Sequence, residues 1–286
     1  MADTPPAQKN RELLVKKSNG DLVPFEEEKL RHSLAKAGTA PASIEFIVKE
    51  IRSMIVPGIS TRKIYQRAFS MLKKESQPSA ARYKLKRAIM ELGPSGFPFE
   101  RYVGELLQDQ GYQVEIGVHE QGRCITHEVD IVGEKENKRI AVECKFGNTK
   151  DKKLDVKVAL YIHSRFQDLA NRWSTMPEHA GKEFQGWIVT NGQFSGDAQT
   201  YGTCAGLHLV SWDFPGQGNL KDLIDVCHLH PVTSLTTLKK REKDFVIHKG
   251  IILCRDLLNR DDLFEEMNFT KYRKKKAIDE ILGLCG

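Results

Sequence analysis

The chain has 286 residues, of which 40% are hydrophobic and 29% are charged, enough for two or three globular domains with apolar cores. It has no run of 18 apolar residues that would span a membrane, and its polar start, MADTPPAQKNRELL, lacks the apolar stretch of a secretory signal. Six scattered cysteines without a CxxC pair argue against a zinc site and favour a reducing cytoplasm.

The net charge of +6 is unevenly distributed. Residues 1–94 carry +8 (18 basic against 10 acidic), residues 95–215 carry −4 (13 against 17), and residues 216–286 carry +2 (13 against 11). An acidic centre between basic flanks suits a metal site set between phosphate-binding surfaces. A net charge of +6 is nevertheless ordinary for this length, so charge alone decides little.

After a disordered N-terminus at residues 1–11, residues 12–92 are predicted to form a small domain. Asn19-Gly20 lies between two apolar runs and is a strong signal for a β-hairpin. The apolar spacing that follows predicts a helical bundle. Its helices are expected from Phe25 onward and over residues 43–56, 60–75 and 79–92.

The segments VKKSNGDLVPFEEEKLRHSLAKAG, MIVPGISTRKIYQRAFSML and AARYKLKRAI, in this order, resemble the ATP-cone, a regulatory nucleotide-binding module of many ribonucleotide reductases. The resemblance implies that ATP or dATP binds as a regulatory ligand. It places Lys16 and Lys17 at the phosphates, with Lys29, Tyr83 and Lys86 near the site. Lysines can meet phosphate as point charges, although each could equally serve solubility. Because no GxxxxGK motif is present, we expect binding without hydrolysis.

Residues 93–98, with two prolines and two glycines, are predicted to be a linker. Pro98 suits the first turn of a helix, and Gly111 suits its C-terminal end. A strand over residues 112–116 is expected to follow. Helix and strand together would open a second domain at residues 99–214.

The stretch HEVDIVGEKENKRIAVECKF, residues 127–146, predicts two strands joined by a polar turn at residues 134–138. Glu143 and Lys145 alternate with apolar residues and therefore share one face of the second strand. An antiparallel partner brings Asp130 level with them. Two carboxylates of this kind can hold Mg²⁺ or Mn²⁺, and the ammonium can assist attack on a phosphodiester.

The arrangement of Asp130 followed by Glu143-Cys144-Lys145 resembles the PD-(D/E)XK nuclease superfamily, although Val129 stands where the motif has a proline. In similar restriction-type nucleases a glutamate on the preceding helix adds a further acid. That position matches Glu100, with Glu105 as the substitute if the register differs. The alternative reading of these charges is a solvated strand or helix face.

His127 lies three residues before Asp130 and could touch substrate or metal, although a hydrogen-bonded structural role is the commoner one. A helix is predicted over residues 155–173, then a buried strand over 184–191 and a helix over 198–205. A last strand is predicted over 207–212. The pattern TNGxFSxxAxxYG, followed by a strand that ends in SW, resembles the catalytic domain of Mrr-like restriction endonucleases.

The C-terminal region, residues 215–286, is predicted to be helical. The expected helices cover residues 220–226, 235–245, 249–258 and 272–282. Basic clusters at residues 239–241 and 271–276 could follow a phosphate backbone or could simply be solvated.

The sequence thus predicts a multi-domain chain. A hairpin with a helical bundle precedes a central α/β restriction-endonuclease-like fold, with a mixed sheet flanked by helices, and a helical C-terminal tail. The expected function is a cytoplasmic, metal-dependent DNA endonuclease, homo-oligomeric and regulated by ATP or dATP. A catalytically silent, nucleotide-regulated nucleic-acid-binding protein is the alternative, and RNA as the substrate remains open.

Overall fold

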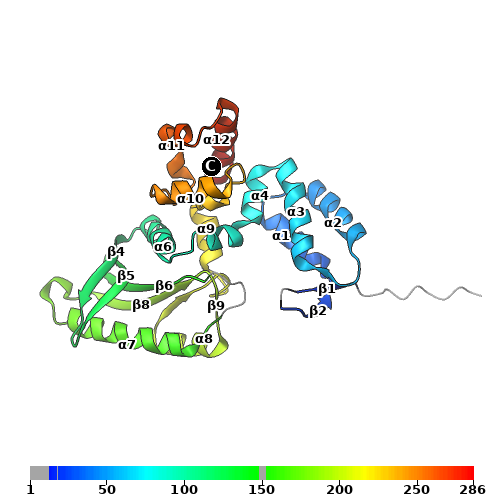
Figure 1. Cartoon of the computed structure of the whole chain (residues 1–286). Coiled ribbons are helices and arrows are strands. Elements are labelled where there is room, and N and C mark those ends of the chain that lie inside the picture. Colours follow the sequence, from blue (N-terminus) through cyan, green and yellow to red (C-terminus); the bar gives the residue numbers. More distant parts are fainter. Residues whose placement is uncertain (1–12, 18, 148–152) are drawn as a thin grey trace, which may run out of the picture. The chain divides into compact units, whose positions relative to one another are not determined.

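The structure is a computed structural model that describes residues 13–17, 19–147 and 153–286 (Figure 1). The N-terminus predicted to be disordered, residues 1–11, and residues 148–152 lie outside the described residues. The chain divides into two compact units, Met1–Lys84 and Leu85–Gly286. Each unit has a hydrophobic core of its own.

The first unit combines a small sheet with a helical bundle. Its strand β1 (Leu14–Lys16) pairs antiparallel with β2 (Leu22–Pro24), which confirms the hairpin, and parallel with β3 (Ile59–Ser60). The helices are α1 (Glu27–Lys36), α2 (Pro41–Met54), α3 (Thr61–Glu75) and α4 (Gln77–Tyr83). Helical apolar spacing gives each of α2 and α3 one buried face.

The single helix predicted over residues 79–92 is wrong. Helix α4 ends at Tyr83, and a separate helix, α5 (Leu85–Met90), follows after Lys84. Ala80 belongs to the core of the first unit, whereas Leu85 belongs to the core of the second. The two halves therefore bury their apolar faces in different cores, on either side of the break at Lys84.

The second unit is built on a mixed sheet with the strand order β10-β8-β6-β5-β4. Its strands are β4 (Gln113–Gln121), β5 (Thr126–Lys135), β6 (Lys138–Lys145), β8 (Glu183–Thr190) and β10 (His208–Val210). β5 pairs antiparallel with β4 and with β6, whereas β6, β8 and β10 run parallel to one another. The predicted β5–β6 hairpin is confirmed, with a turn shorter than expected at Glu136-Asn137.

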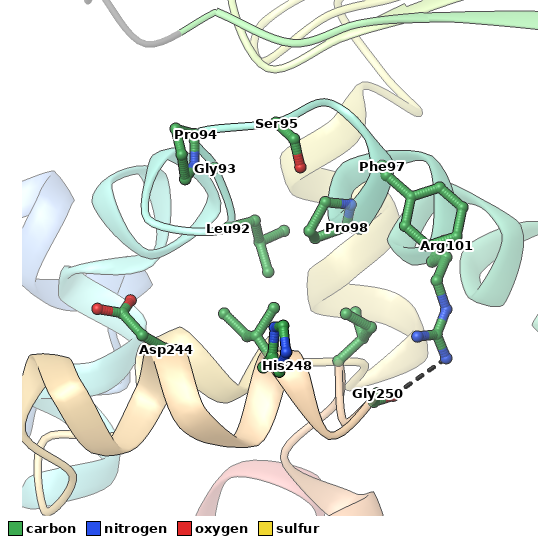
Figure 2. A pocket seen from close by; sticks show the side chains of 12 residues that line it. Leu92, Gly93, Pro94, Ser95, Phe97, Pro98, Arg101, Asp244, His248 and Gly250 are labelled. Atoms are coloured by element: carbon green, nitrogen blue, oxygen red, sulfur yellow. Dashed lines mark hydrogen bonds between the residues drawn. The ribbon is translucent and has the colours of Figure 1, made fainter.

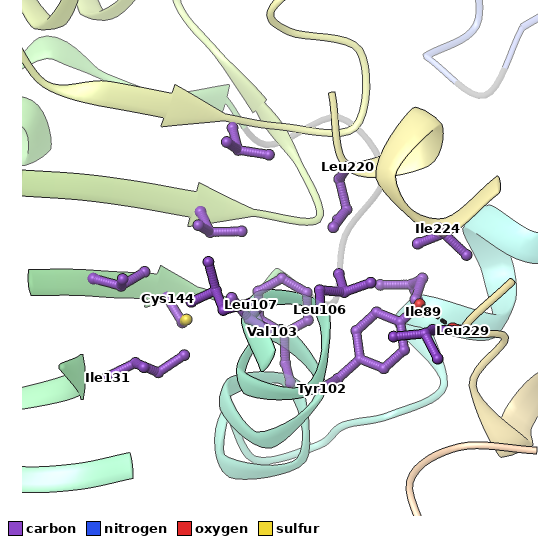
Figure 3. Packing of buried hydrophobic residues seen from close by; sticks show 14 of the residues in the cluster. Ile89, Tyr102, Val103, Leu106, Leu107, Ile131, Cys144, Leu220, Ile224 and Leu229 are labelled. Atoms are coloured by element: carbon purple, nitrogen blue, oxygen red, sulfur yellow. Dashed lines mark hydrogen bonds between the residues drawn. The ribbon is translucent and has the colours of Figure 1, made fainter. Parts of the chain in front are cut away.

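Helices cover both faces of this sheet (Figure 1). Helix α6 (Phe97–Asp109) packs on one face, where Phe99 and Tyr102 are fully buried together with Ile131 and Val142 of the hairpin. Figure 3 shows Tyr102 and Ile131 within this cluster. Helices α7 (Val156–Trp173) and α8 (Gly196–Cys204) pack on the other face, over Val129. A short pair, β7 (Lys153–Leu154) and β9 (Gln193–Phe194), and the 3₁₀ turn Pro177–His179 complete this part.

The C-terminal region is helical and continuous with the core around α6. Its helices are α9 (Leu220–Cys227), α10 (Lys240–His248), α11 (Asp261–Glu266) and α12 (Lys271–Cys285), with 3₁₀ turns at Val232–Ser234 and Arg255–Leu257. The Tyr102 hydroxyl donates to the carbonyl oxygen of Leu229 at 2.7 Å. The region is therefore anchored directly on α6.

The helix predicted over residues 249–258 is wrong, and the one predicted over 235–245 begins and ends later, as α10. Gly250, at φ +85°, ends α10 in the left-handed conformation that glycine adopts without strain. The apolar residues that follow are extended, and Leu253 forms an antiparallel bridge with Pro231. A short run that is buried on all sides gives the same apolar pattern as a helix.

Within the described residues, no helix is both long enough and apolar enough to cross a membrane.

Candidate active site

The β5–β6 hairpin brings the predicted trio together. The backbone N–H of Cys144 donates to Asp130 Oδ2 at 2.7 Å, which fixes the Asp130 carboxylate against the neighbouring strand. Glu143 is only 4% exposed, and one of its carboxylate oxygens accepts a hydrogen bond from Lys145 Nζ. Alternation along β6 thus places the carboxylate and the ammonium on one face, beside Asp130.

Glu100 lies in the first turn of α6 and belongs to the same group of charges. Burial, followed by repulsion from Asp130, Glu128 and Glu143, raises its pKa to about 7. Glu105 instead approaches Arg255 at 3.7 Å on another side of α6. Of the two glutamates considered from the sequence, Glu100 is the one whose charge interacts with Asp130.

Asp130 is also difficult to ionise. Burial, together with repulsion from Glu143, raises its pKa to about 6, although the Cys144 N–H, Lys145 and Arg165 act in the opposite direction. Carboxylates whose pKa values rise in this way are crowded and poorly solvated. Binding of a cation or a proton therefore lowers the free energy of a site of this kind.

Arg165, on α7, completes the site and was not predicted from the sequence. Its Nη1 donates to Glu143 Oε2 at 2.7 Å, and its Nη2 donates to the carbonyl oxygen of Glu128. A signal was available, because Arg165 follows Ile162 by three residues and precedes Phe166, within the apolar stripe of the helix. An arginine in such a stripe needs a buried partner.

His127 takes part in a hydrogen-bond network with Asp168. Its Nε2 lies 2.8 Å from Asp168 Oδ2, and the Asp168 carboxylate also accepts from the backbone N–H groups of Cys124 and Ile125. The hydrogen bond from His127 is the first cause that lowers the pKa of Asp168, to about 2. The commoner of the two readings of His127 therefore agrees with its geometry.

Two buried side chains at the end of β8 fix the end of the Lys145 strand. Thr190 Oγ1 donates to the carbonyl oxygen of Lys145 at 2.6 Å. Asn191, 3% exposed, accepts from the N–H of Gly147 at 2.7 Å and donates to its carbonyl oxygen at 2.9 Å. The predicted TNG segment thus holds the backbone that leaves the candidate site.

Four of the five predicted nucleotide-binding residues lie in the first unit. Lys16 ends β1 and Lys17 follows it, both exposed, and Lys29 on α1 pairs with Glu26 at 2.7 Å. Tyr83 ends α4 and stacks on Tyr65, with ring centroids 5.0 Å apart, and burial raises its pKa above the usual value.

Lys86 belongs to the second unit, on α5, where its Nζ lies 5.5 Å from the centroid of the Trp212 ring. The structure therefore places Lys86 in a different unit from the other four predicted nucleotide-binding residues.

The basic clusters of the C-terminal region are partly engaged with their surroundings. Arg273 stacks on Phe269 and pairs with Glu242 at 3.0 Å, and Lys274 pairs with Asp261 at 2.8 Å. Residues 239–241 are exposed around the start of α10.

A pocket of about 430 Å³ lies between residues 92–98, α6 and α10, where Arg101 donates to the carbonyl oxygen of Gly250 (Figure 2). Its lining contains neither the hairpin trio nor Glu100.

The donor chemistry of the site fits a hard divalent cation. Asp130, Glu143 and Glu100 offer carboxylate oxygens, which Mg²⁺ and Mn²⁺ prefer, and the first and last have raised pKa values that a cation would relieve. No group of three His, Cys, Asp or Glu side chains in the described part of the chain is already gathered closely enough to hold a metal ion. Glu143 instead uses its two oxygens on Lys145 and Arg165.

Three family models match consecutive parts of the chain. Residues 13–88 match the ATP cone domain, residues 93–213 match the restriction endonuclease domain of the Mrr catalytic type, and residues 230–285 match the C-terminal domain of AF1548-like proteins. The chain therefore carries, in this order, regions that match an ATP-cone, a restriction-endonuclease domain and an AF1548-like C-terminal domain. The first two resemblances are confirmed, and the third was not predicted.

Relatives of known sequence or structure cover about two thirds of the chain. An uncharacterized protein of Archaeoglobus fulgidus is 29% identical over 185 residues, which are 64% of this chain and 100% of that protein. The crystal structure of a protein of unknown function, AF1548, is similar with a TM-score of 0.53 and 28% identity, over 67% of this chain and 99% of that one. Can2 from Sulfobacillus thermosulfidooxidans, in complex with cyclic tetra-adenylate, has a TM-score of 0.33 at 13% identity, over 69% and 54% of the two chains.

Proposed function

We propose that the protein is a metal-dependent DNA endonuclease that hydrolyses phosphodiester bonds. The observation that carries the proposal is the crowding of Asp130, Glu143 and Glu100 beside Lys145, within a domain that matches restriction endonucleases. Asp130 and Glu143 would hold Mg²⁺ or Mn²⁺, with Glu100 as a further acid. When bound, the cation lowers the pKa of a water molecule and neutralises charge that develops on the phosphate.

The side chains of this site have separate roles. Asp130 is held by the Cys144 N–H, so its carboxylate keeps one orientation. Lys145, 37% exposed, is the solvent-facing cation and can contact a phosphate oxygen or an attacking water. Arg165, 14% exposed, orients Glu143 from the side of α7.

The same proposal extends to regulation and assembly. ATP or dATP binds the ATP-cone through Lys16 and Lys17, with Lys29 and Tyr83 nearby, and is not hydrolysed. The enzyme acts in the cytoplasm as a homo-oligomer, because a double-strand cut requires two active centres. Whether RNA is cleaved as well can be decided by incubating a matched RNA duplex with the purified chain and Mg²⁺ or Mn²⁺.

The rival function is a catalytically silent protein in which nucleotide controls nucleic-acid binding. A plasmid-nicking assay of the purified full-length chain separates the two. Conversion of supercoiled plasmid to nicked or linear forms with Mg²⁺ or Mn²⁺, and its loss with EDTA, is the expected result. Intact plasmid at all metal concentrations, with and without ATP, would favour the silent protein.

A further inference from the structure

One face of α7 runs from the candidate active site to a polar pocket. Arg165, Asp168 and Arg172 are spaced by three and four residues, so they lie along the same side of the helix. Over seven residues the direction of a side chain drifts by only about 20°. Arg165 contacts Glu143, and Arg172 lies two turns further along.

Asp168 fixes the β4–β5 loop to this face of α7. It accepts hydrogen bonds from the N–H groups of Cys124 and Ile125, and the N–H of Arg123 donates to its carbonyl oxygen at 3.0 Å. Gly122 approaches so closely that a Cβ there would lie 2.1 Å from Asp168 Oδ2. The loop is therefore held in one place, and Arg123 is carried with it.

A pocket of about 390 Å³ opens beyond Asp168, between this loop and the end of α7. All of its lining residues are polar or glycine: Gln121, Gly122, Arg123, Asn171, Arg172 and Thr175. Among the residues that the structure describes, no carboxylate forms an ion pair with Arg123 or Arg172. Two guanidinium groups thus share a concave site whose lining contains no acidic side chain, although the Asp168 carboxylate lies behind Gly122.

Guanidinium groups present planar pairs of donors that match the oxygens of a phosphate. Gln121 is occupied within its own loop, where it accepts from Thr126 and donates to the Gly122 carbonyl oxygen, and the Thr175 hydroxyl donates to the Arg172 carbonyl oxygen. The donors that remain for a ligand are mainly those of the two arginines. An anion with several acceptor oxygens and little bulk is the ligand that fits.

The distance along α7 relates this pocket to the scissile phosphate. Seven residues at 1.5 Å each separate Arg165 from Arg172 by about 10 Å. We propose that Arg123 and Arg172 form a subsite for a backbone phosphate of the nucleic acid, about 10 Å along α7 from the candidate active site.

This inference rests on the proposed function, since it takes DNA as the substrate, but its test does not require cleavage. The full-length chain is titrated into a fluorescein-labelled 30-base-pair duplex in EDTA, and anisotropy is read over a series of NaCl concentrations. We expect Arg123→Gln with Arg172→Gln to weaken binding about tenfold. The slope of log affinity against log salt should also become shallower, by about 0.9 for each phosphate that the protein no longer neutralises.

Lys138→Gln is the control variant, because Lys138 is exposed at the β5–β6 turn and the substitution also removes a positive charge from this domain. It should leave the slope of log affinity against log salt unchanged. The thermal unfolding midpoint of each variant should equal that of the wild type. Wild-type affinity and slope in the double variant would overturn the proposal, as would an equal effect in Lys138→Gln. A lowered unfolding midpoint with unchanged binding would reduce Arg172 to a cation that stabilises the end of α7.

The two proposals fail in different ways. If the wild-type chain binds the duplex with a slope that depends on the two arginines, yet never cleaves with metal, the subsite stands and the nuclease proposal falls. If the chain cleaves but the arginines do not affect binding, the reverse holds. Absence of any binding to the duplex contradicts the subsite directly.

Discussion

Glu143 is the side chain on which the candidate site depends most. It is almost fully buried and accepts hydrogen bonds from Lys145 and Arg165, one on each carboxylate oxygen. A buried carboxylate with two cationic partners is stable only while those partners remain. A metal ion that binds Glu143 has to compete with Lys145 and Arg165 for the two carboxylate oxygens. We therefore expect the site to depend on the negative charge of Glu143 and not only on its shape.

The amide variants test this directly. Glu143→Gln and Asp130→Asn keep shape and remove charge, and we expect each to lower plasmid cleavage roughly 10²–10⁴-fold while DNA binding persists. The measurements are a nicking assay with Mg²⁺ and duplex anisotropy in EDTA. Glu105→Gln, on the other side of α6, is the control and should cleave like the wild type. Normal cleavage by both amide variants would remove the site assignment.

The raised pKa values predict how stability depends on pH when metal is absent. Asp130 titrates at about 6 and Glu100 at about 7, above the ordinary values of 3.8 and 4.5. Between those limits the folded state binds more protons than the unfolded state, so the free energy of unfolding falls as pH rises through this window. Above the higher pKa it levels off.

Thermal unfolding in EDTA over about pH 5–8 should show this fall. Glu100→Gln should flatten the upper part of the curve, because it removes one of the two groups. Mg²⁺ should raise the unfolding midpoint more at the alkaline end, where both carboxylates are free of protons. An identical pH profile in the variant and the wild type would contradict the placement of Glu100.

At the scale of elements, Asn191 at the end of β8 holds the backbone that follows the neighbouring strand β6. Asn191→Ala removes both hydrogen bonds to Gly147 and leaves that backbone unpaired. We expect a loss of about 1–3 kcal/mol in unfolding free energy, and reduced cleavage because Gly147 lies two residues after Lys145. Asn259→Ala, at an exposed position, should change stability by less than about 0.5 kcal/mol. Chemical denaturation measures both losses. Equal losses in the two variants would contradict the stabilising role of the Asn191–Gly147 hydrogen bonds.

Local pattern was sufficient for the elements whose partner is the next element along the chain. The β5–β6 hairpin follows from alternation and a polar turn, so the grouping of Asp130, Glu143 and Lys145 could be predicted. Arg165 could not be placed in the same way, because its contact with Glu143 spans 22 residues and depends on how α7 packs on the sheet.

The wrong helices have physical causes of the same kind. Residues 79–92 have helical spacing throughout, but the two halves serve different cores, and only the tertiary fold reveals the break at Lys84. Residues 251–254 are buried on every side, so their sequence carries no periodicity that separates strand from helix.

For the whole molecule, we expect nucleotide and DNA binding to be coupled. Coupling of this kind is typically about 1–3 kcal/mol, or roughly 5–150-fold in affinity, and it must be reciprocal. Duplex affinity with and without saturating ATP, and ATP affinity with and without duplex, should therefore change by the same factor. Light scattering in both states would show whether the oligomer changes as well.

Lys16→Glu with Lys17→Glu should abolish ATP binding and the coupling, while metal-dependent cleavage without ATP persists. Lys36→Glu with Lys49→Glu, at exposed positions of α1 and α2, makes the same charge change and should preserve both. ATP binding that survives in the first pair, or DNA affinity that is indifferent to ATP in the wild type, would count against the regulatory role. Steady ATP hydrolysis would contradict binding without turnover.

Helix α5 has a consequence for how these modules can be inherited or engineered. The ATP-cone match extends to residue 88, but the second compact unit already begins at Leu85, and Leu85 and Ile89 are part of its buried core. A cut after residue 88 would deprive the second unit of Leu85, whereas a cut between Lys84 and Leu85 leaves both buried cores complete and only shortens the ATP-cone match. Recombination that exchanges the first module therefore has to leave α5 with the second unit.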